Sequence, residues 1–381
     1  MMKSSERMAD IDVFEFPTDK NSISIYIHIP FCERKCSYCA FVSFCLSKVE
    51  REKYINSLLD EIENFSTPKK VKTVYLGGGT PSLLTKDEIF AIFSKLREKF
   101  DIVENAEITI EVNPNSVDEE KLRAYKEVGI NRISVGVQSL SNKMLKSIGR
   151  LHTKEEAIEK LKLIKKYFGN ISADLILGLS GEKSVIKYAK KLIKLKVKHI
   201  SSYMLEVHEN TKLYFEVRDK KYRPLDEKGV IKSYDKLVKF LKKRGIVQYE
   251  VSNFALAGYE SKHNLNYWNY GEYVGFGVSS HSFLRGRRIA NADTLQGYYK
   301  RERKEEKITK KMEIEERIML GLRCYLGVDI SILKNLGYDI QKSESYRKFL
   351  KEGGIVEYGE KFYLLPKYFK FADYYILNLL P

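Results

Sequence analysis

The sequence predicts an α/β protein: a partial (β/α)6 barrel followed by a small C-terminal α+β winged-helix-like domain. Two observations predict this fold. Between residues 24 and 205, six short β-branched runs alternate with longer amphipathic stretches, which is the pattern of a parallel sheet covered by helices. The 381 residues are 43% hydrophobic, enough for one large and one small core, so a disordered or fibrous protein is excluded.

Six predicted strands and the helix starts between them define the barrel. The strands cover residues 24–29, 71–76, 107–112, 132–137, 172–177 and 200–205. Three residue pairs have the spacing of a capping box, in which a hydroxyl and a carboxylate three residues later bond the free amides of a helix start. The pairs are Thr85 with Glu88, Ser116 with Glu119 and Thr153 with Glu156.

The rest of the chain divides by composition. A helix is predicted over 225–244, ended by Gly245, with an extended segment at 248–253. Residues 255–283 are rich in glycine and aromatic side chains, which predicts an irregular functional region. A dense charge run at 298–311 marks a boundary. The predicted domains are an N-terminal extension (1–22), the barrel core (23–285), a charged linker (286–311) and a C-terminal domain (312–381) with a helix at 312–326 and a hairpin at 355–365.

The chain is strongly basic, with a formal net charge of +16. Such an excess favours a polyanionic partner: a nucleic acid, an acidic membrane surface or an anionic ligand. The lysines, however, are spread over most predicted helices and are mixed with acidic residues, which is typical of solvated helix faces. We therefore predict no nucleic-acid partner and keep peripheral membrane contact as a hypothesis. The sequence is compatible with a monomer or a dimer.

The cysteines and the hydropathy indicate a cellular compartment. The N-terminal residues lack the apolar core of a signal peptide, and no run of about 18 apolar residues occurs. The five cysteines are an odd number and four of them lie within residues 32–45, which argues against an extracellular disulfide scaffold. We predict a cytoplasmic protein in which the clustered cysteines bind a metal or redox group.

Cys32, Cys36 and Cys39 have the spacing C-x3-C-x2-C directly after the first predicted strand. Zinc sites take four ligands, and no later Cys/His pair completes such a set. A 4Fe-4S cluster held by three thiolates keeps one iron free to bind a small molecule, so this cluster is favoured over zinc or unliganded cysteines. Cys45 and Cys324 lie outside the spacing, and we predict both to be inert, with Cys324 on an apolar helix face.

Glycine and polar residues follow the other strands, at the edge where parallel barrels place their sites. The run Gly77-Gly78-Gly79-Thr80 follows the second strand and indicates either a tight turn or backbone that a ligand approaches closely. Polar groups beside apolar strands need partners, and several on successive units favour a ligand-facing role over a structural one. These polar residues are Glu111, Gln138, Arg150 and Asp174.

The cysteine loop resembles that of the radical S-adenosylmethionine (SAM) superfamily. The resemblance implies a radical SAM barrel, a 4Fe-4S cluster on the three cysteines, and reductive cleavage of SAM to a 5′-deoxyadenosyl radical. It implies that the glycine run holds the carboxylate and amino groups of SAM, with two tyrosines near the adenine and the cluster and four polar residues around the ribose and methionine. The implied SAM residues are Tyr26, Tyr38, Gly78, Gly79, Thr80, Glu111, Gln138, Arg150 and Asp174. Residues 178–182 lack the Pro and Gln usual in the family, so only the shape of that loop differs from the expectation.

The residues before Cys32, Tyr-Ile-His-Ile-Pro-Phe, are similar to a branch that contains oxygen-independent coproporphyrinogen III oxidase and the HemW-type heme chaperones. The oxidase has a fourth cysteine at the position of Phe41 and a longer N-terminal segment, so the resemblance favours the chaperones. A second motif of that branch, H-N-x-x-Y-W, is present at His263, Tyr267 and Trp268. An imidazole beside aromatic rings suits a porphyrin, although a histidine bonded within its own loop explains the same pattern.

The resemblance to HemW-type chaperones implies that the chain binds heme as cargo, together with the cluster and SAM, and delivers it to respiratory proteins. It assigns no catalytic residue. Two alternatives stay open. One is an oxidase that uses the radical to decarboxylate coproporphyrinogen III, and the other is a radical enzyme acting on tRNA, suggested by the basic charge and the winged-helix-like domain.

Overall fold

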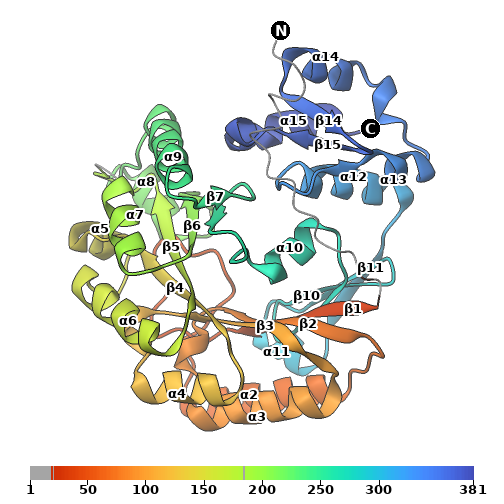
Figure 1. The fold of residues 1–381 in the computed structure, drawn as a ribbon. Helices are drawn as coiled ribbons and strands as arrows, with labels where there is room; N and C mark the ends of the chain where they lie inside the picture. The colour runs from red at the N-terminus through yellow and green to blue at the C-terminus, as the bar shows by residue number, and fades with distance from the viewer. Residues whose placement is uncertain (1–18, 20, 183–184) are drawn as a thin grey trace.

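The structure, a computed structural model, describes residue 19 and residues 21–182 and 185–381, so most of the predicted extension at 1–22 lies outside the described residues. The main sheet has twelve strands in the described ranges, in the order β12-β11-β10-β9-β1-β2-β3-β4-β5-β6-β8-β7. The six predicted strands are all present and parallel, in a partial barrel (Figure 1). They are β1 (Ser22–Ile29), β2 (Lys70–Gly78), β3 (Ile102–Val112), β4 (Arg132–Gln138), β5 (Asn170–Leu177) and β6 (His199–Met204).

Most helices that follow the strands cover the outer face of the barrel and bury one apolar stripe each against it, whereas the short helices at 142–147 and 212–218 bury side chains in a separate cluster beside the cysteine loop. The helices that follow the strands are α2 (Lys48–Glu63), α3 (Lys86–Lys99), α4 (Glu119–Glu127), α5 (Asn142–Ser147), α6 (Lys154–Tyr167), α7 (Val185–Lys194), α8 (Lys212–Arg218) and α9 (Glu227–Lys242). The last of these confirms the helix predicted over 225–244. The extended segment predicted at 248–253 is instead a turn between two short antiparallel strands, β7 (Val247–Gln248) and β8 (Asn253–Ala255).

Two of the three predicted capping boxes are confirmed, those of Thr85 with Glu88 and of Thr153 with Glu156. The one at Ser116 is wrong. Asp118 lies one residue before α4, and its carboxylate accepts from Lys121 N at 2.9 Å. The carboxylate is the stronger acceptor for a helix start, while the Ser116 hydroxyl lies 2.6 Å from that of Ser82.

The region 255–283, predicted to be irregular, is ordered into regular elements. It contains α10 (Lys262–Trp268), β9 (Tyr273–Phe276) and β10 (His281–Leu284). Strand β9 pairs in parallel with the buried strand β1, so the sheet has one more parallel strand than predicted. A four-residue strand with an internal glycine has no alternation to reveal it, and pairing with β1 determines its conformation.

The span 286–311, predicted to be a charged linker, instead continues the sheet. It forms β11 (Arg287–Asn291), α11 (Leu295–Tyr299) and β12 (Arg303–Lys307). Arg287 and Glu305 form an ion pair of 2.7 Å across the two strands, and every residue of β12 is exposed. Charged side chains protect an edge strand from pairing with other chains, so the charge run that suggested a linker belongs to an edge of the sheet.

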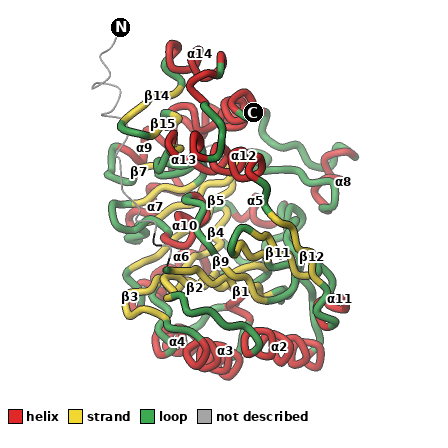
Figure 2. Tube along the Cα trace, turned by 90° about the vertical axis from the view of Figure 1, so that its right-hand side faces the viewer, coloured by secondary structure: helices red, strands yellow, loops and turns green. Residues whose placement is uncertain are grey.

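The C-terminal part has its own apolar core and a three-stranded sheet in the order β13-β15-β14. The predicted hairpin is confirmed as β14 and β15, but the predicted helix ends early, so the buried Cys324 lies after it rather than on it. Figures 1 and 2 show this part on the opposite side of the barrel from α2, α3 and α4. No helix among the described residues is long and apolar enough to cross a membrane. The elements of the C-terminal part are α12 (Lys310–Gly321), β13 (Val328–Asp329), α13 (Ile330–Asn335), α14 (Glu344–Glu352), β14 (Ile355–Tyr358), β15 (Lys361–Leu364) and α15 (Ala372–Leu379).

Candidate cofactor and ligand site

A cavity of about 940 Å³ lies at the carboxyl ends of the barrel strands. Its wall runs from the loop after β1 across the ends of the other strands to α10 and to residues 369–373 of the C-terminal part. Parallel strands end at the same edge of a barrel, so residues far apart in the sequence meet here. The predicted residues in its wall are Cys32, Cys36, Tyr38, Cys39, Gly78, Gly79, Thr80, Glu111, Gln138, Arg150, Asp174 and Trp268.

The cysteine loop is fixed to the barrel at both ends. Cys32 N donates to Phe44 O at 3.0 Å, and the His28 side chain on β1 reaches Val42 O, 2.8 Å from its Nε2. No group of three or more His, Cys, Asp or Glu side chains within 21–182 and 185–381 is close enough to hold a single metal ion. A 4Fe-4S cluster takes its thiolates on separate irons, so its ligands stand farther apart. The three cysteines fit such a cluster because all of them face one cavity.

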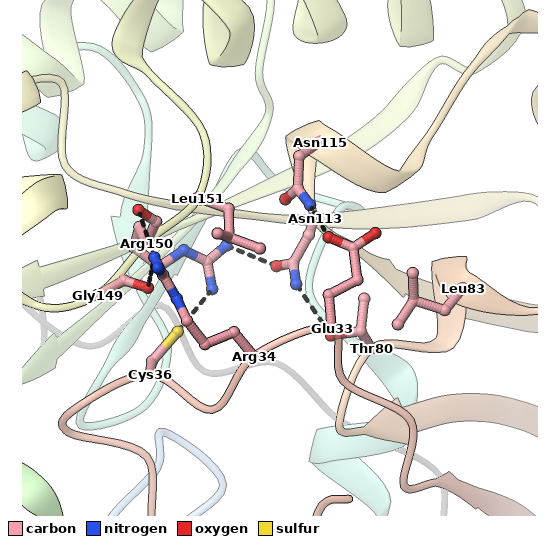
Figure 3. A pocket seen from close by; sticks show the side chains of 10 residues that line it. All are labelled: Glu33, Arg34, Cys36, Thr80, Leu83, Asn113, Asn115, Gly149, Arg150 and Leu151. Atoms are coloured by element: carbon pink, nitrogen blue, oxygen red, sulfur yellow. Dashed lines mark hydrogen bonds between the residues drawn. The ribbon is translucent and has the colours of Figure 1, made fainter. Parts of the chain in front are cut away.

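Arg150 connects the cysteine loop to the ends of β3 and β4, and Figure 3 shows its contacts with Cys36 and Asn113. Its guanidinium donates to Asn113 Oδ1 at 2.5 Å and to Gly136 O at 2.7 Å, and its Nη1 lies 3.8 Å from Cys36 Sγ. Asn113 donates in turn to Thr80 Oγ1 at 3.0 Å. The same side chains line a small polar cavity of about 20 Å³ behind the loop, which has room for a water molecule. One buried cation therefore joins the loop, the glycine run and the end of β4.

The glycine run approaches the cysteine loop so closely that side chains do not fit. Gly78 has φ +114°, and a Cβ there would lie 2.6 Å from the His28 imidazole. A Cβ on Gly79 would lie 2.7 Å from Phe31 O. Glycine is therefore required at both positions, and the backbone here is left open toward the cavity that Thr80 also lines.

Two half-buried carboxylates, Glu111 on β3 and Asp174 on β5, face the cavity. Burial, with a contribution from Asp174, raises the pKa of Glu111 to about 7, although a hydrogen bond of 2.8 Å from Tyr75 Oη works against this rise. Burial also raises the pKa of Asp174, which accepts from Ser134 Oγ at 3.2 Å. Gln138 ends β4 with φ +61°, a left-handed backbone that few non-glycine residues adopt. Glu111, Asp174 and Gln138 therefore offer polar partners to a ligand in the cavity.

Tyr26 lies behind the cavity wall rather than in it. Its ring packs on Tyr75, with centroids 6.3 Å apart, and its hydroxyl lies 3.0 Å from His28 Nδ1. Several cavity residues were not predicted from the sequence, among them the polar residues Asn113 and Arg132. Both follow the alternation of their strands, two residues after Glu111 and six before Gln138, and this period of two is the signal that would have revealed them.

The H-N-x-x-Y-W motif forms α10 and meets the cavity at one edge. His263 is 1% exposed, and both ring nitrogens are engaged, Nδ1 with Thr73 Oγ1 at 2.7 Å and Nε2 with Tyr267 Oη at 2.8 Å. Burial lowers the pKa of His263 to about 3. Of the three predicted motif residues, only Trp268 lines the cavity, together with Asn264 one turn earlier. His263 thus fixes α10 against β2, and α10 presents Trp268 to the site.

Comparison with known proteins identifies the family. A sequence model of the Radical SAM superfamily matches residues 26–184. Proteins named heme chaperone HemW are 36% identical in Lactococcus lactis, over 82% of this chain and 84% of the relative, and 34% identical in Escherichia coli, over 76% and 80%. The chain belongs to the HemW family.

A solved structure shares the fold of this HemW-family chain. The coproporphyrinogen III oxidase HemN of Escherichia coli, a radical SAM enzyme, superposes with a TM-score of 0.79 at 21% identity, covering 100% of this chain and 94% of HemN. The match confirms a radical SAM barrel with a C-terminal domain. The cofactors of the superfamily are a 4Fe-4S cluster and SAM, and the cavity of the HemW-family chain offers three thiolates and a ring of polar groups that fit them.

The pH dependence of SAM binding tests the role of Glu111 in this HemW-family chain. Its carboxyl, with a pKa of about 7, is mostly protonated below that pH and ionised above it. The resemblance implies that Glu111 lies near the SAM ribose, where an ionised carboxylate would accept hydrogen bonds from the hydroxyls more strongly, so SAM affinity should rise about tenfold as the pH increases through this range. Glu111→Gln should lack the rise, as measured by calorimetry on cluster-loaded protein. The titration of SAM itself is common to both proteins, so equal slopes would contradict the prediction.

Proposed function

We propose that the chain binds heme in the cavity at the barrel's carboxyl end and delivers it to respiratory proteins. The observation that carries the proposal is a single cavity that joins the cysteine loop to Trp268 and to residues 369–373. Its volume of about 940 Å³ is near the upper end of ligand pockets, roughly 300–1,000 Å³, and leaves room for a bulky ligand beside SAM. The names of the HemW relatives support heme as that ligand.

In this proposal the cluster and SAM share the part of the cavity next to the cysteine loop. Cys32, Cys36 and Cys39 hold the cluster, which supplies an open iron for SAM. Arg150 keeps the loop in place, and Tyr26 supports the glycine run from behind. The residues proposed to contact SAM are Tyr38, Gly78, Gly79, Thr80, Glu111, Gln138, Arg150 and Asp174.

Heme is proposed to lie on the side of the cavity formed by α10. Trp268 provides an aromatic face there, and its Nε1 is buried without a hydrogen-bond partner, as is expected of a donor kept for a ligand. His263 and Tyr267 act by holding α10 in place, because both nitrogens of His263 are already engaged. The iron ligand is therefore not assigned to His263.

Anaerobic reconstitution tests the proposal against the oxidase alternative. The cluster-loaded chain is given SAM, and heme or coproporphyrinogen III is added to parallel samples. We expect a heme absorbance band that co-elutes with the protein, and no carbon dioxide from coproporphyrinogen III. Turnover of coproporphyrinogen III would contradict a chaperone, as would heme that separates from the protein on gel filtration. Phe41 stands where the oxidase has its fourth cysteine, which favours the first outcome.

Trp268→Leu is expected to weaken heme binding about tenfold, because the substitution removes the aromatic face but keeps an apolar side chain. Heme titration followed by absorbance measures the loss. Tyr374→Leu is the matched control, since Tyr374 is 53% exposed on α15 and outside the cavity wall. Unchanged heme affinity in Trp268→Leu would remove heme from this side of the cavity.

Peripheral contact with a membrane is part of the proposal, because respiratory recipients are membrane complexes. The predicted cytoplasmic location and the oligomeric state, monomer or dimer, stay predictions. The charge pattern of the surface assigns the membrane contact to a specific face of the molecule.

A further inference from the structure

Two neighbouring helices, α7 and α9, carry a dense set of lysines on their outer surface. The helices pack against each other beside β5 (Figure 1). All the lysines in this set are exposed. We call them the lysine face, and its members are Lys187, Lys190, Lys191 and Lys194 on α7, and Lys228, Lys232, Lys236, Lys239 and Lys243 on α9 and its C-cap.

The helical period places these lysines on one side of each helix. At about 100° per residue, the four on α7 fall within roughly 100° of one another and the five on α9 within roughly 80°. The opposite side of α7 buries Val185, Ala189 and Leu192, and that of α9 buries Tyr234 and Leu237 among others. The apolar stripes bind both helices to the barrel, so the lysines of both helices point outward from adjoining surfaces.

The nine lysines of the lysine face have no acidic partner among the described residues, unlike the lysines of α3. None of its nine lysines lies within 4.0 Å of an acidic group that the structure describes. On α3, by contrast, Lys95 and Lys99 both pair with Glu63. The few acidic residues nearby are used otherwise: Asp226 caps α9, Asp235 pairs with Lys370 at 2.5 Å, and Glu182 accepts from Gly178 N, while Glu227 lies in the first turn of α9.

This concentration of unpaired charge favours an anionic partner, and its chemistry favours a lipid surface over a nucleic acid. Every member is a lysine, whereas nucleic-acid sites favour the planar, bidentate guanidinium of arginine. No exposed large apolar or aromatic side chain among the described residues lies on α7 or α9, so bases have nothing there to stack on. Clusters of several lysines on an amphipathic helix are typical of binding to anionic lipid headgroups.

We infer that the lysine face binds the surface of an anionic lipid bilayer. The face is connected to the ligand cavity through α9. Tyr234 of that helix lines the cavity, and Asp235 pairs with Lys370, which lines it from the C-terminal part. A bilayer on the lysine face would therefore be separated from the cavity by the thickness of α9, whose inner side contributes Tyr234 to the cavity wall. The inference stands on charge and geometry, and does not depend on heme as the ligand.

Vesicle co-sedimentation of the full chain tests the inference without heme. The vesicles are phosphatidylcholine alone or phosphatidylcholine mixed with phosphatidylglycerol, each at low and high salt. The wild type should bind only the mixed vesicles, and high salt should release it. Replacing six lysines of the face with glutamine (Lys187, Lys191, Lys194, Lys232, Lys236 and Lys239) should lower the partition coefficient roughly a hundredfold or more.

A second six-fold variant keeps the same total charge change but leaves the lysine face intact. It replaces lysines exposed on or beside α6 and β12, namely Lys162, Lys165, Lys166, Lys304, Lys307 and Lys310. The partition coefficient of this control on the mixed vesicles should fall less than about threefold, and both variants should keep the wild-type unfolding midpoint. Equal losses in the two variants would overturn the inference, as would equal binding to neutral vesicles. Tighter binding of the wild type to a single- or double-stranded nucleic acid than to the mixed vesicles would assign the face to nucleic acid instead.

Discussion

Replacing Gly79 with alanine is expected to lower the thermal unfolding midpoint by about 3 °C and to abolish SAM binding. The new methyl group would lie 2.7 Å from Phe31 O and 2.9 Å from the carbonyl carbon of Pro30. Both atoms belong to the backbone at the start of the cysteine loop, so they cannot rotate away as a side chain would. Overpacking of this kind costs about 1–3 kcal/mol, and relieving it moves the glycine run away from the loop.

Gly169→Ala is the matched control for this substitution. A Cβ on Gly169, in the turn before β5, meets nothing within 4 Å, so the midpoint and SAM affinity should stay at their wild-type values. Scanning fluorimetry measures the midpoint, and calorimetry on cluster-loaded protein measures SAM binding. A Gly79→Ala protein that behaves like the Gly169→Ala protein in both measurements would show that the close approach of the two backbones is dispensable.

The barrel could be predicted because its signals are local. Each of the six strands is a compact β-branched run, and the capping boxes at Thr85 and Thr153 mark helix starts without any knowledge of the fold. The positions of the site residues followed from the same pattern, since a parallel barrel brings the ends of its strands together. This is why cysteines at the end of β1 and carboxylates on β3 and β5 meet in one cavity.

The parts that the sequence did not predict depend on pairing between distant segments. Strand β9 is a strand because β1 pairs with it, and β12 is a strand because its backbone pairs with β11, with one ion pair, Arg287–Glu305, between them. The side-chain partners of His263 are likewise non-local. Thr73 lies on β2, 190 positions away, so the sequence left open whether the imidazole faces a ligand or its own surroundings. In the structure both ring nitrogens of His263 bond neighbouring protein side chains, Thr73 and Tyr267.

Glu107, on β3 beneath α10, is the second position where we expect a large effect. Its Oε2 accepts from Lys262 N at 3.1 Å and its Oε1 from His263 N at 3.0 Å. Arg132, only 2% exposed, lies beside it. Burial acts to lower the pKa of Arg132, but nearby carboxylate and phenol groups, Glu107 foremost, raise it above its ordinary value. One buried carboxylate therefore serves the start of α10 and compensates a buried cation.

Glu107→Gln should lower the unfolding midpoint by about 4 °C, because it removes the carboxylate that contributes most to stabilising the buried Arg132 cation, a loss of about 3 kcal/mol. Arg132→Met removes the cation and spares the bonds of Glu107 to α10. The double variant should then be less destabilised than the sum of the two single variants, by at least about 1 kcal/mol. Because α10 carries Trp268, the heme affinities of the variants should follow the same order as their unfolding midpoints. Glu107→Gln should bind heme most weakly, and the double variant should recover part of the lost affinity. Strictly additive midpoints would mean that the two charges do not compensate each other, and that α10 is held by its backbone bonds alone.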